Sequence, residues 1–318
     1  MKKIPLIILS FVAAFIIIES TMIAFPPPKS VPMLAALEDP FQSVNFSKIP
    51  DVQYYMARDG SKLAYREYLK QPSNKIVVLV HGSSGSSGGM HPLAEYLQKQ
   101  GITVYSLDIR GHGHSGRKGD IDYIGQLEDD MEDFVNQVLK QRNTTLVGFS
   151  SGGGFVLRFA ASERQKLFHR YILLSPYIAY NSPTVKPKNG GWADVSYSRI
   201  IGILLLGPAG EKLFGQLPVI TFALDQRRAQ NRTPQYSFRL LRNFSPHYHY
   251  ESDILSVKKP LTVLVGEKDE LFNANAFEPL FTKFKPDTKV IIVPNMGHIT
   301  LTTNLSGISV IANTIVHE

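Results

Sequence analysis

A serine set between two glycines, where a strand meets a helix, constrains this chain more than any other feature. Residues 144–147 are β-branched and apolar, typical of a short buried strand, and residues 155–161 are typical of a helix. Between them, residues 148–152 read Gly-Phe-Ser-Ser-Gly, a match to G-x-S-x-G. A Cβ at either glycine would strike the adjoining strand or helix, so glycine permits a sharp turn there. We therefore expect Ser150 to lie on a strained turn, as a catalytic nucleophile does.

Two other interpretations of this stretch compete with that one. Ser151 is the neighbouring hydroxyl, but the residue two places before it is Phe149 rather than glycine, which favours Ser150. The five-residue pattern also occurs by chance in turns rich in glycine and serine. The strand and the helix on either side favour the catalytic interpretation, with Gly148 and Gly152 as the flanking glycines of the turn.

Length and composition limit the classes of protein to consider. The chain has 318 residues, of which 43% are hydrophobic and 19% charged, so it can bury a sizeable core in one large α/β domain with an insertion, or in two small domains. It has no cysteine, which excludes disulfides and thiolate metal sites. The net charge of +7 favours anionic surfaces or substrates. No basic stripe interleaved with aromatic residues occurs, so we expect no nucleic-acid partner.

The first 25 residues have the pattern of a signal anchor or a signal peptide. Lys2 and Lys3 precede an apolar run from Ile4 to Ile18, and a second short run ends at Phe25. The lysines place the N-terminus in the cytoplasm and the rest of the chain on the extracytoplasmic side, periplasmic or extracellular. A helix of the buried core is the weaker alternative for this stretch.

The cleavage signal in this segment is poor. Cleavage after Ala24 or after Ser20 would put Met22 or Ile18 at the position three residues earlier, where a small residue is preferred. This favours an uncleaved membrane anchor, and the protein is secreted if the segment is removed. Residues 26–50 begin with three prolines, and we expect a loose, extended linker that runs to about Pro50.

From residue 51 onward, strands and helices alternate, which predicts a mostly parallel twisted sheet with helices on both faces. The first two strands, 54–57 and 62–69, are expected to form a hairpin with Asp59-Gly60 in its turn. The continuous apolar runs are typical of strands buried on both faces. We expect further strands at 75–80, 102–107, 144–147, 171–174, 261–265 and 289–293, and helices at 88–100, 123–141, 155–161 and 275–284.

The alternation stops at Pro176 and resumes at about residue 260. We therefore expect a core domain made of residues 51–176 and 260–318, with residues 177–259 as an inserted cap of apolar helices and loops rather than a second sheet. The apolar runs 200–206 and 217–224 are too short to cross a bilayer. They fit the buried core of the cap, or the wall of a substrate channel.

Two residues further along can activate the serine. A hydroxyl is a weak nucleophile until a base takes its proton, and that base needs a third group to orient it. Asp269 follows the strand 261–265, and His298 follows the last strand, so both lie at carboxyl ends of strands, where open α/β sheets place their sites. Their order along the chain, serine then acid then histidine, fits this kind of site. Glu267 and Glu270 compete with Asp269 for the orienting role.

A reaction at an acyl carbon also needs N–H donors for the oxyanion. We expect one from the backbone of Ser151, directly after the nucleophile, and one from the backbone of Ser83, in the turn His81-Gly82-Ser83-Ser84-Gly85. The alternatives for this turn are a flexible loop or a phosphate cradle. A cradle is disfavoured because the pattern G-x-x-x-x-G-K-[ST] is missing.

The segment 108–116, Asp-Ile-Arg-Gly-His-Gly-His-Ser-Gly, follows the strand 102–107. Its aspartate and two histidines suggest a metal site, but no further ligands cluster with them in the sequence, and a serine nucleophile needs no metal. We therefore favour a structural role for this loop and expect neither a metal nor a cofactor.

With these residues in order, the chain resembles the α/β-hydrolase superfamily, and most closely the monoacylglycerol lipase and lysophospholipase-like group. The resemblance covers residue 54 to the C-terminus, and its motifs are His81-Gly82, the 108–116 segment (similar to D-x-R-G-H-G-x-S), Gly148 to Gly152, Asp269 and His298. It implies an α/β-hydrolase fold with a cap inserted after the sixth strand, and an acyl pocket between cap and core.

The residues themselves and the family resemblance both predict a serine ester hydrolase. We expect it to act on an acyl ester, such as a monoglyceride or a lysophospholipid, through an acyl-enzyme. An acyltransferase or a cofactor-free peroxidase on the same scaffold is the alternative, because one fold hosts many chemistries. A membrane-tethered binding module with an inert site is the non-enzymatic alternative, and the presence of all three side chains disfavours it.

Overall fold

A single eight-stranded sheet carries the site. The computed structural model describes residues 14, 17–24, 28–29, 31–69, 75–139, 144–224 and 232–317. The sheet has the order β1-β2-β4-β3-β5-β6-β10-β11. Strand β2 pairs antiparallel with β1 and β4, and all other neighbours are parallel. The strands are β1 (Val52–Met56), β2 (Lys62–Tyr68), β3 (Ile76–Val80), β4 (Thr103–Leu107), β5 (Thr144–Phe149), β6 (Arg170–Leu174), β10 (Leu261–Gly266) and β11 (Lys289–Val293).

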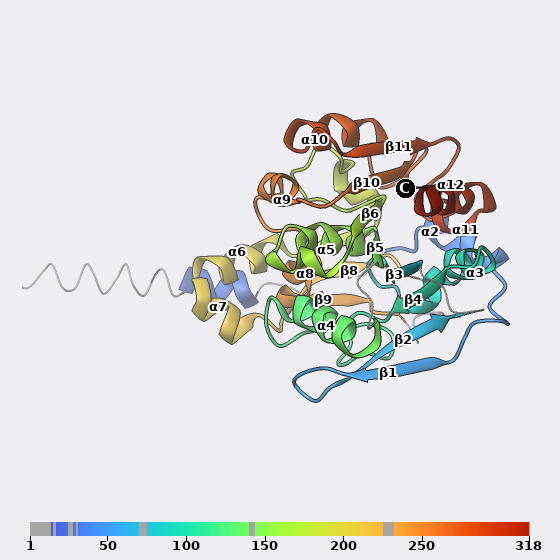
Figure 1. Ribbon diagram of the computed structural model, residues 1–318. Helices are drawn as coiled ribbons and strands as arrows, with labels where there is room; N and C mark the ends of the chain where they lie inside the picture. The colour runs from blue at the N-terminus through green and yellow to red at the C-terminus, as the bar shows by residue number, and fades with distance from the viewer. Residues whose placement is uncertain are drawn as a thin grey trace, which may run out of the picture.

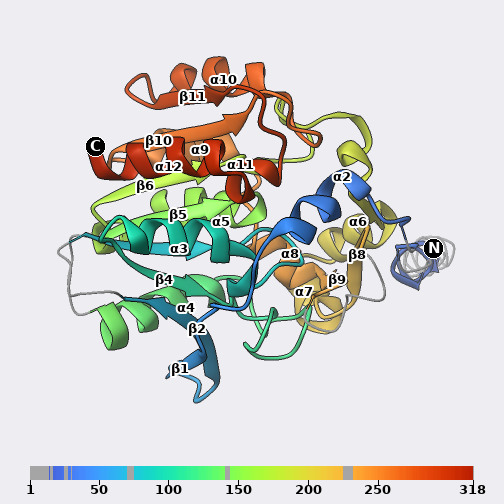
Figure 2. The same ribbon diagram turned by 90° about the vertical axis from the view of Figure 1, so that its right-hand side faces the viewer.

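Helices cover both faces of the sheet (Figures 1 and 2). One face carries α3 (His91–Lys99), α11 (Thr300–Thr303) and α12 (Leu305–His317), which contact one another. The opposite face carries α4 (Gln126–Phe134), α5 (Ser151–Ala160), α9 (Tyr250–Ser256) and α10 (Phe277–Phe284). A π-helical turn continues α4 to Leu139. The predicted α/β architecture is confirmed.

Apolar sequence runs explain why the central strands are fully covered. Every residue of β3, β5 and β10 is buried, as expected for parallel strands with helices on both sides. The predicted β1–β2 hairpin is also present, and Gly60 in its turn has a φ of 82°, a value that suits glycine. These buried strands place their carboxyl ends along one edge of the sheet, where the expected site residues follow them.

The predicted insertion after β6 is present, but its composition differs from the expectation. It contains α6 (Tyr197–Leu205), α7 (Gly207–Phe214) and α8 (Phe238–Asn243). It also contains a three-stranded antiparallel sheet, so the expectation of helices and loops alone was wrong. Strands of three to five residues are too short to show a clear alternation of apolar and polar residues. The strands are β7 (Ala193–Val195), β8 (Pro218–Phe222) and β9 (Gln235–Ser237).

The segment before the sheet is ordered where a loose linker was expected. Residues 35–38 form helix α2, and residues 39–43 continue it as a 3-10 helix, η1. Pro40 suits the first turn of this helix, because that turn needs no hydrogen bond from its N–H. Leu37 and Glu38 are buried, which holds the segment against the domain. Figure 2 shows α2, in blue, between α11 and the cap.

The N-terminal apolar stretch lies largely outside the described residues, so the predicted anchor at residues 1–25 stays a prediction. Its described part, residue 14 and residues 17–24, is helical, and Ile23 packs with Ile203 of cap helix α6. Arg199 on α6 donates a hydrogen bond to the carbonyl oxygen of Ile23 at 2.9 Å. Within the described residues, no helix combines the length and the apolar character needed to cross a membrane.

Candidate active site

The turn between β5 and α5 has the strained geometry that the sequence predicts. Ser150 has φ 55° and ψ −121°, an unfavourable conformation for a residue with a side chain. A Cβ on Gly148 would lie 2.3 Å from the carbonyl oxygen of Gly152, and a Cβ on Gly152 would lie 2.3 Å from that of His81. Both glycines are therefore required sterically, and the turn presents the Ser150 side chain at the edge of the sheet.

The three expected side chains meet at this edge. Nε2 of His298 lies 3.0 Å from Oγ of Ser150, and Nδ1 of the same ring lies 2.8 Å from Oδ2 of Asp269. All three residues are buried. They come from loops that follow β5, β10 and β11, so the sheet alone brings together residues 148 positions apart in the chain. The predicted proximity is confirmed.

The two competing acids near Asp269 have other partners. Glu267 accepts a hydrogen bond from the backbone N–H of Asn295 at 2.9 Å. Glu270 accepts one from the backbone N–H of His298 at 2.6 Å. Both carboxylates therefore hold the loop that carries the histidine, whereas the carboxylate of Asp269 contacts the imidazole ring itself.

Asp269 is kept ionised although it is buried. Burial alone would raise its pKa, but the charge of His298 and the hydrogen bonds that the carboxylate accepts outweigh burial and lower it. Among these bonds, the backbone N–H groups of Leu271 and Phe272 each donate to Oδ1 at 2.9 Å. A fixed negative charge at Nδ1 keeps the proton on that nitrogen, which leaves Nε2 free to accept the proton of Ser150.

The turn after β3 is positioned to supply an oxyanion donor. Nδ1 of His81 and the N–H of Gly85 both bind the carbonyl oxygen of Gly82, at 2.8 Å and 3.1 Å. In a trans peptide the next N–H, that of Ser83, points the opposite way from this carbonyl. A Cβ on Gly82 would lie 3.0 Å from Cβ of Ser150, so the turn runs directly beside the serine. The second expected donor, the N–H of Ser151, is the first of α5 and has no partner within the helix.

The 108–116 loop supports the oxyanion turn. Oδ1 of Asp108 accepts the backbone N–H of Ser87 at 2.6 Å, and Oδ2 accepts that of His114 at 2.9 Å. Arg110 pairs with Asp130 at 2.7 Å, which ties the loop to α4. These bonds confirm the structural role. In the described parts of the chain no cluster of three or more histidine, cysteine, aspartate or glutamate residues suits a metal ion.

Comparison with known proteins shows which family this chain belongs to. A model of the Hydrolase_4 family, described as serine aminopeptidase, S33, matches residues 71–303. The match covers more than half of the chain. The chain belongs to this hydrolase family. The α/β-hydrolase resemblance expected from the sequence is therefore confirmed.

Individual relatives of this hydrolase are named as lipases or esterases. A monoacylglycerol lipase from Mycolicibacterium smegmatis is 27% identical over 237 residues, which are 70% of this chain and 80% of that protein. A soluble variant of monoglyceride lipase from Saccharomyces cerevisiae has a similar fold, with a TM-score of 0.64 at 19% identity, over 86% of this chain and 98% of the other. A carboxylesterase from Bacillus subtilis gives a TM-score of 0.62 at 17% identity, over 89% and 96%.

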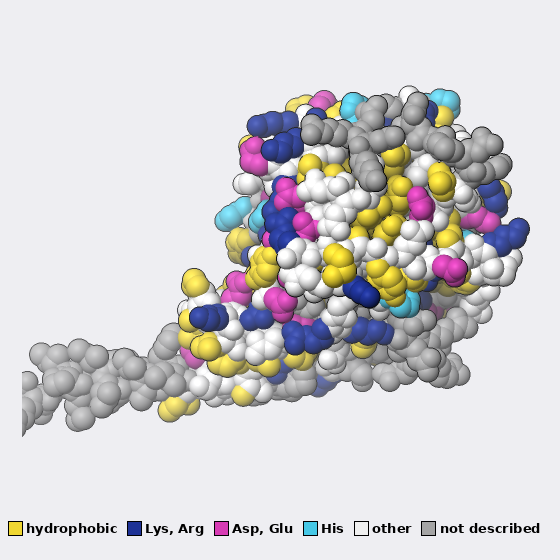
Figure 3. Space-filling model, turned by 60° about the horizontal axis from the view of Figure 1, so that its bottom comes forward, with side chains coloured by type: hydrophobic (Ala, Val, Ile, Leu, Met, Phe, Trp, Pro, Cys, Tyr) yellow, Lys and Arg dark blue, Asp and Glu magenta, His cyan; other side chains and the backbone are white. Residues whose placement is uncertain are grey.

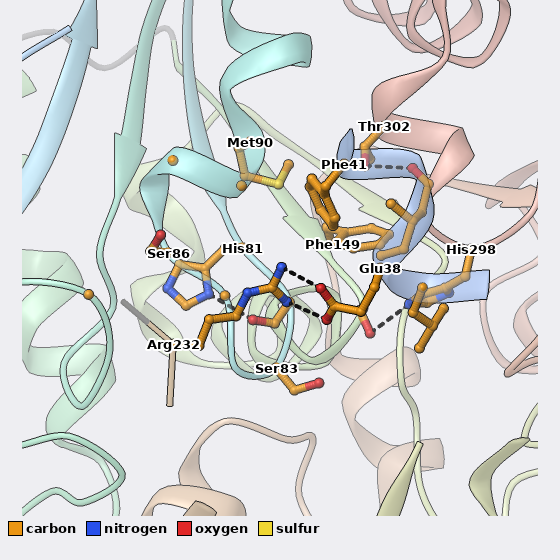
Figure 4. Close-up of a pocket in the computed structure, with 18 of the residues that line it drawn as sticks. Glu38, Phe41, His81, Ser83, Ser86, Met90, Phe149, Arg232, His298 and Thr302 are labelled. Carbon is orange, nitrogen blue, oxygen red and sulfur yellow. Dashed lines mark hydrogen bonds and ion pairs between the residues drawn. The ribbon is translucent and has the colours of Figure 1, made fainter. Parts of the chain in front are cut away.

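Two cavities meet at Ser150 in this α/β-hydrolase. The larger, of about 570 Å³, lies beneath the cap, and its lining is mainly apolar, with residues such as Ile178, Ile200, Leu204, Phe222 and Phe244. The smaller, of about 360 Å³, is bordered by His298 and by residues of α2 and η1 (Figure 4). Ser83, Ser150, Trp192 and Leu271 border both. The serine therefore stands between an apolar compartment and a more polar one.

The sequence did not point to some of the residues around the site. Trp192, in the cap, donates a hydrogen bond from Nε1 to Oγ of Ser83 at 2.9 Å. Its only signal was that it is the single tryptophan of the chain. Lys186, also in the cap, donates from Nζ to the carbonyl oxygen of Asp269. Both link the cap to the site, and contacts of this kind leave no periodic pattern in a sequence.

Proposed function

We propose that this serine ester hydrolase cleaves monoacylglycerols with a long acyl chain, with Ser150, His298 and Asp269 as its catalytic residues. The observation that carries the proposal is the hydrogen-bonded series of these three side chains beside an apolar cavity of about 570 Å³. Mostly apolar cavities bind apolar groups, which favours an acyl chain. The relative from M. smegmatis, itself named as a monoacylglycerol lipase, supports glycerol as the alcohol.

The proposed mechanism uses the three side chains in turn. Oγ of Ser150 attacks the ester carbonyl carbon while Nε2 of His298 takes its proton, and Asp269 stabilises the imidazolium that forms. The N–H groups of Ser83 and Ser151 bind the oxyanion. His298 then protonates the departing alcohol oxygen, which leaves an acyl-enzyme. Water, deprotonated by His298, attacks this ester, and His298 then gives that proton to Oγ of Ser150 as the fatty acid is released.

An aminopeptidase, which the family description names, would need a negative group for the ammonium of its substrate. Glu38 borders the smaller cavity and is buried, but Arg232 binds it through both carboxylate oxygens, at 3.0 Å and 3.2 Å. The negative charge of Glu38 is therefore already compensated. This pairing, together with the apolar larger cavity, favours a neutral ester over a peptide with a free amino end.

We also propose that the N-terminal segment anchors the enzyme to a membrane, with the catalytic domain on the extracytoplasmic side. The charge and hydropathy of residues 1–25 support this. Leu204 and Leu205 on α6 and Leu213 on α7 are exposed, and hydrophobic side chains lie on that side of the molecule in Figure 3. Alkaline washing of membranes, and protease treatment of cells from which any outer membrane and wall have been removed, test this. Release of the whole protein by the wash, or protection of the catalytic domain from protease, would contradict it.

The substrate proposal is tested with purified full-length protein and two sets of esters. A series of p-nitrophenyl esters of increasing acyl length should show kcat/KM rising towards long chains, because the larger cavity gains apolar contacts. Monoacylglycerol and lysophosphatidylcholine with one shared acyl chain then compare the alcohols, and we expect the glycerol ester to react faster. Activity confined to acetate, or a preference for the lysophospholipid, would refute the substrate assignment.

A further inference from the structure

The alcohol part of the substrate belongs in the smaller cavity. During acylation, the imidazole that took the proton of the serine returns it to the departing oxygen, so the alcohol must lie on the histidine's side of the serine. His298 borders the smaller cavity, as do its neighbours Ile299 and Thr302. The apolar lining of the larger cavity fits the acyl chain. The two halves of an ester therefore occupy different compartments, with the scissile bond at Ser150.

The wall of this smaller cavity comes from an unexpected part of the chain. Residues 33–49, which we call the N-terminal strap, include α2 and η1, and η1 contacts α11, the helix that follows His298. Figure 4 shows Glu38 and Phe41 of the strap around the same cavity as His298 and Ser83. The strap residues on this wall are Leu37, Glu38, Phe41, Phe46 and Ile49.

An ion pair fixes the strap to the cap across the cavity. Nη1 and Nη2 of Arg232, just before β9, donate to the two carboxylate oxygens of Glu38 at 3.0 Å and 3.2 Å. The same guanidinium lies 5.4 Å from the ring centre of Phe41. Glu38 is only 3% exposed. A bidentate, largely buried pair has one favourable geometry, so it sets the distance between strap and cap.

The chain is also attached at one point before the strap and at one point directly after it. The backbone N–H of Lys29 donates to Asp194 of the cap at 2.6 Å. At the other end, Arg66 on β2 donates to the carbonyl oxygen of Pro50. The strap is thus held by the ion pair at Glu38, and the chain that flanks it is held at both ends.

We propose that the N-terminal strap, locked by Glu38 and Arg232, determines which alcohol the enzyme releases, and that it selects a small neutral polyol of the size of glycerol. This rests on the proposed ester hydrolysis and adds the residues that define its leaving group. The paired charges of Glu38 and Arg232 offer hydrogen-bond partners to hydroxyl groups without a net charge. A bulky alcohol would have to displace the strap and break the pair.

The test compares two esters of one acyl chain, a monoacylglycerol and a p-nitrophenyl ester, on full-length protein. Both give the same acyl-enzyme, so only the acylation step reports on the alcohol. In Glu38→Gln and Arg232→Met, we expect kcat/KM for the glycerol ester to fall about tenfold relative to that for the p-nitrophenyl ester, because each change removes the ion pair that holds the strap to the cap. The rate constant for breakdown of the acyl-enzyme should not change.

Asp39→Asn is the matched control, since Asp39 neighbours Glu38 but is exposed and does not border the cavity. The double variant Glu38→Arg/Arg232→Glu should recover part of the selectivity, because it restores an ion pair at the same place. A selectivity loss caused by structural damage elsewhere would not be recovered. Labelling of Ser150 by a fluorophosphonate checks that each variant is folded. If a single variant does not fold, Phe41→Ala replaces it in the test, because it removes part of the same wall of the smaller cavity without affecting a charge.

The proposal is overturned if folded Glu38→Gln, Arg232→Met and Phe41→Ala all keep the wild-type ratio between the two esters. A wild type that prefers a glycerophosphate ester to the neutral glycerol ester would instead refute the substrate assignment made above. Failure of the proposed function itself looks different: the wild type would then hydrolyse neither the glycerol ester nor the p-nitrophenyl ester.

Discussion

Glu270 accepts a hydrogen bond from the backbone N–H of His298 at 2.6 Å, one residue after the aspartate that binds the ring of the same histidine. The two adjacent acids thus hold His298 at two points, Glu270 at the main chain and Asp269 at the imidazole. Gly297 makes room for this arrangement, because a Cβ there would lie 2.5 Å from the carboxylate of Glu270. The two contacts predict different consequences for the loss of each acid.

Replacement of Asp269 should remove most of the activity. In Asp269→Asn the side chain keeps its shape but can place an amide against Nδ1, which favours the wrong tautomer of His298. We expect kcat for a p-nitrophenyl ester to fall by about 10⁴-fold, the size of loss known for this change in a triad. The measurement is steady-state kinetics on protein whose circular dichroism matches the wild type.

Glu270→Gln is the matched control for that prediction. A glutamine keeps an oxygen that accepts the backbone N–H of His298, so we expect a loss of no more than about tenfold. If Glu270→Gln were as damaging as Asp269→Asn, the orienting role could not be assigned to Asp269 alone.

Replacement of Ser150 separates it from its neighbour. A fluorophosphonate should label the wild type and Ser151→Ala, but not Ser150→Ala, because only Ser150 lies 3.0 Å from Nε2 of His298. We expect hydrolysis by Ser150→Ala to drop by about 10⁴-fold or more. Intact-protein mass spectrometry reads the labelling, and a label on the alanine variant would exclude Ser150 as the nucleophile.

Gly152→Ala should damage both stability and activity. The added Cβ would lie 2.3 Å from the carbonyl oxygen of His81 and 2.8 Å from that of Val80, and neither backbone atom can yield easily. We expect the free energy of unfolding to fall by roughly 1–3 kcal/mol and the serine to shift. Urea unfolding measures the first effect and esterase activity the second.

The control is Gly89→Ala, where an added Cβ meets nothing within 4 Å. Its unfolding free energy should stay within about 0.5 kcal/mol of the wild type. Equal destabilisation of the two alanine variants would show that the tight turn at Gly152 is not the cause.

Mild acid should destabilise the fold through buried histidines. Burial is the main reason that the pKa of His112 is lowered well below its usual value, and the pKa of His81 is lowered too. The unfolded chain, with a histidine pKa of about 6.5, therefore binds protons that the folded chain does not. Stability is fully present above about pH 6.5 and should decrease below it.

Urea midpoints measured from about pH 7.5 down to about 5.5 check this prediction. His112 also binds the hydroxyl of Tyr236 at 2.6 Å, so His112→Gln, which keeps a hydrogen-bonding group, is the informative variant. We expect a less stable protein whose midpoint changes less with pH. An unchanged pH dependence would show that His112 does not carry the effect.

The sequence predicted the core of the site because its signals are local. Gly148, Ser150 and Gly152 are required by one tight turn, and Asp269 and His298 directly follow apolar strands that are easily identified. The sheet edge then brings them together. The same reasoning identified the turn at Ser83 and the insertion after β6.

The sequence did not predict the N-terminal strap or the sheet of the cap. The pair of Glu38 and Arg232 joins residues 194 positions apart, and no spacing rule connects them. Strand β7 has only three residues, too few for an alternating pattern. Proline-rich sequence around residues 26–28 suggested an extended linker, but burial of Leu37 and Glu38 decided the structure instead.

The position of the strap bears on how a recombinant form of this enzyme should be designed. A protein trimmed to begin at Asp51, just before the first strand of the sheet, would keep Ser150, Asp269 and His298, and we expect it to hydrolyse small chromogenic esters. It would nevertheless lack Glu38, the partner of Arg232, and the strap residues that line the smaller cavity. Inhibitors ranked by their affinity for such a shortened protein would be selected for a smaller cavity without its strap, which differs from the cavity of the 318-residue chain.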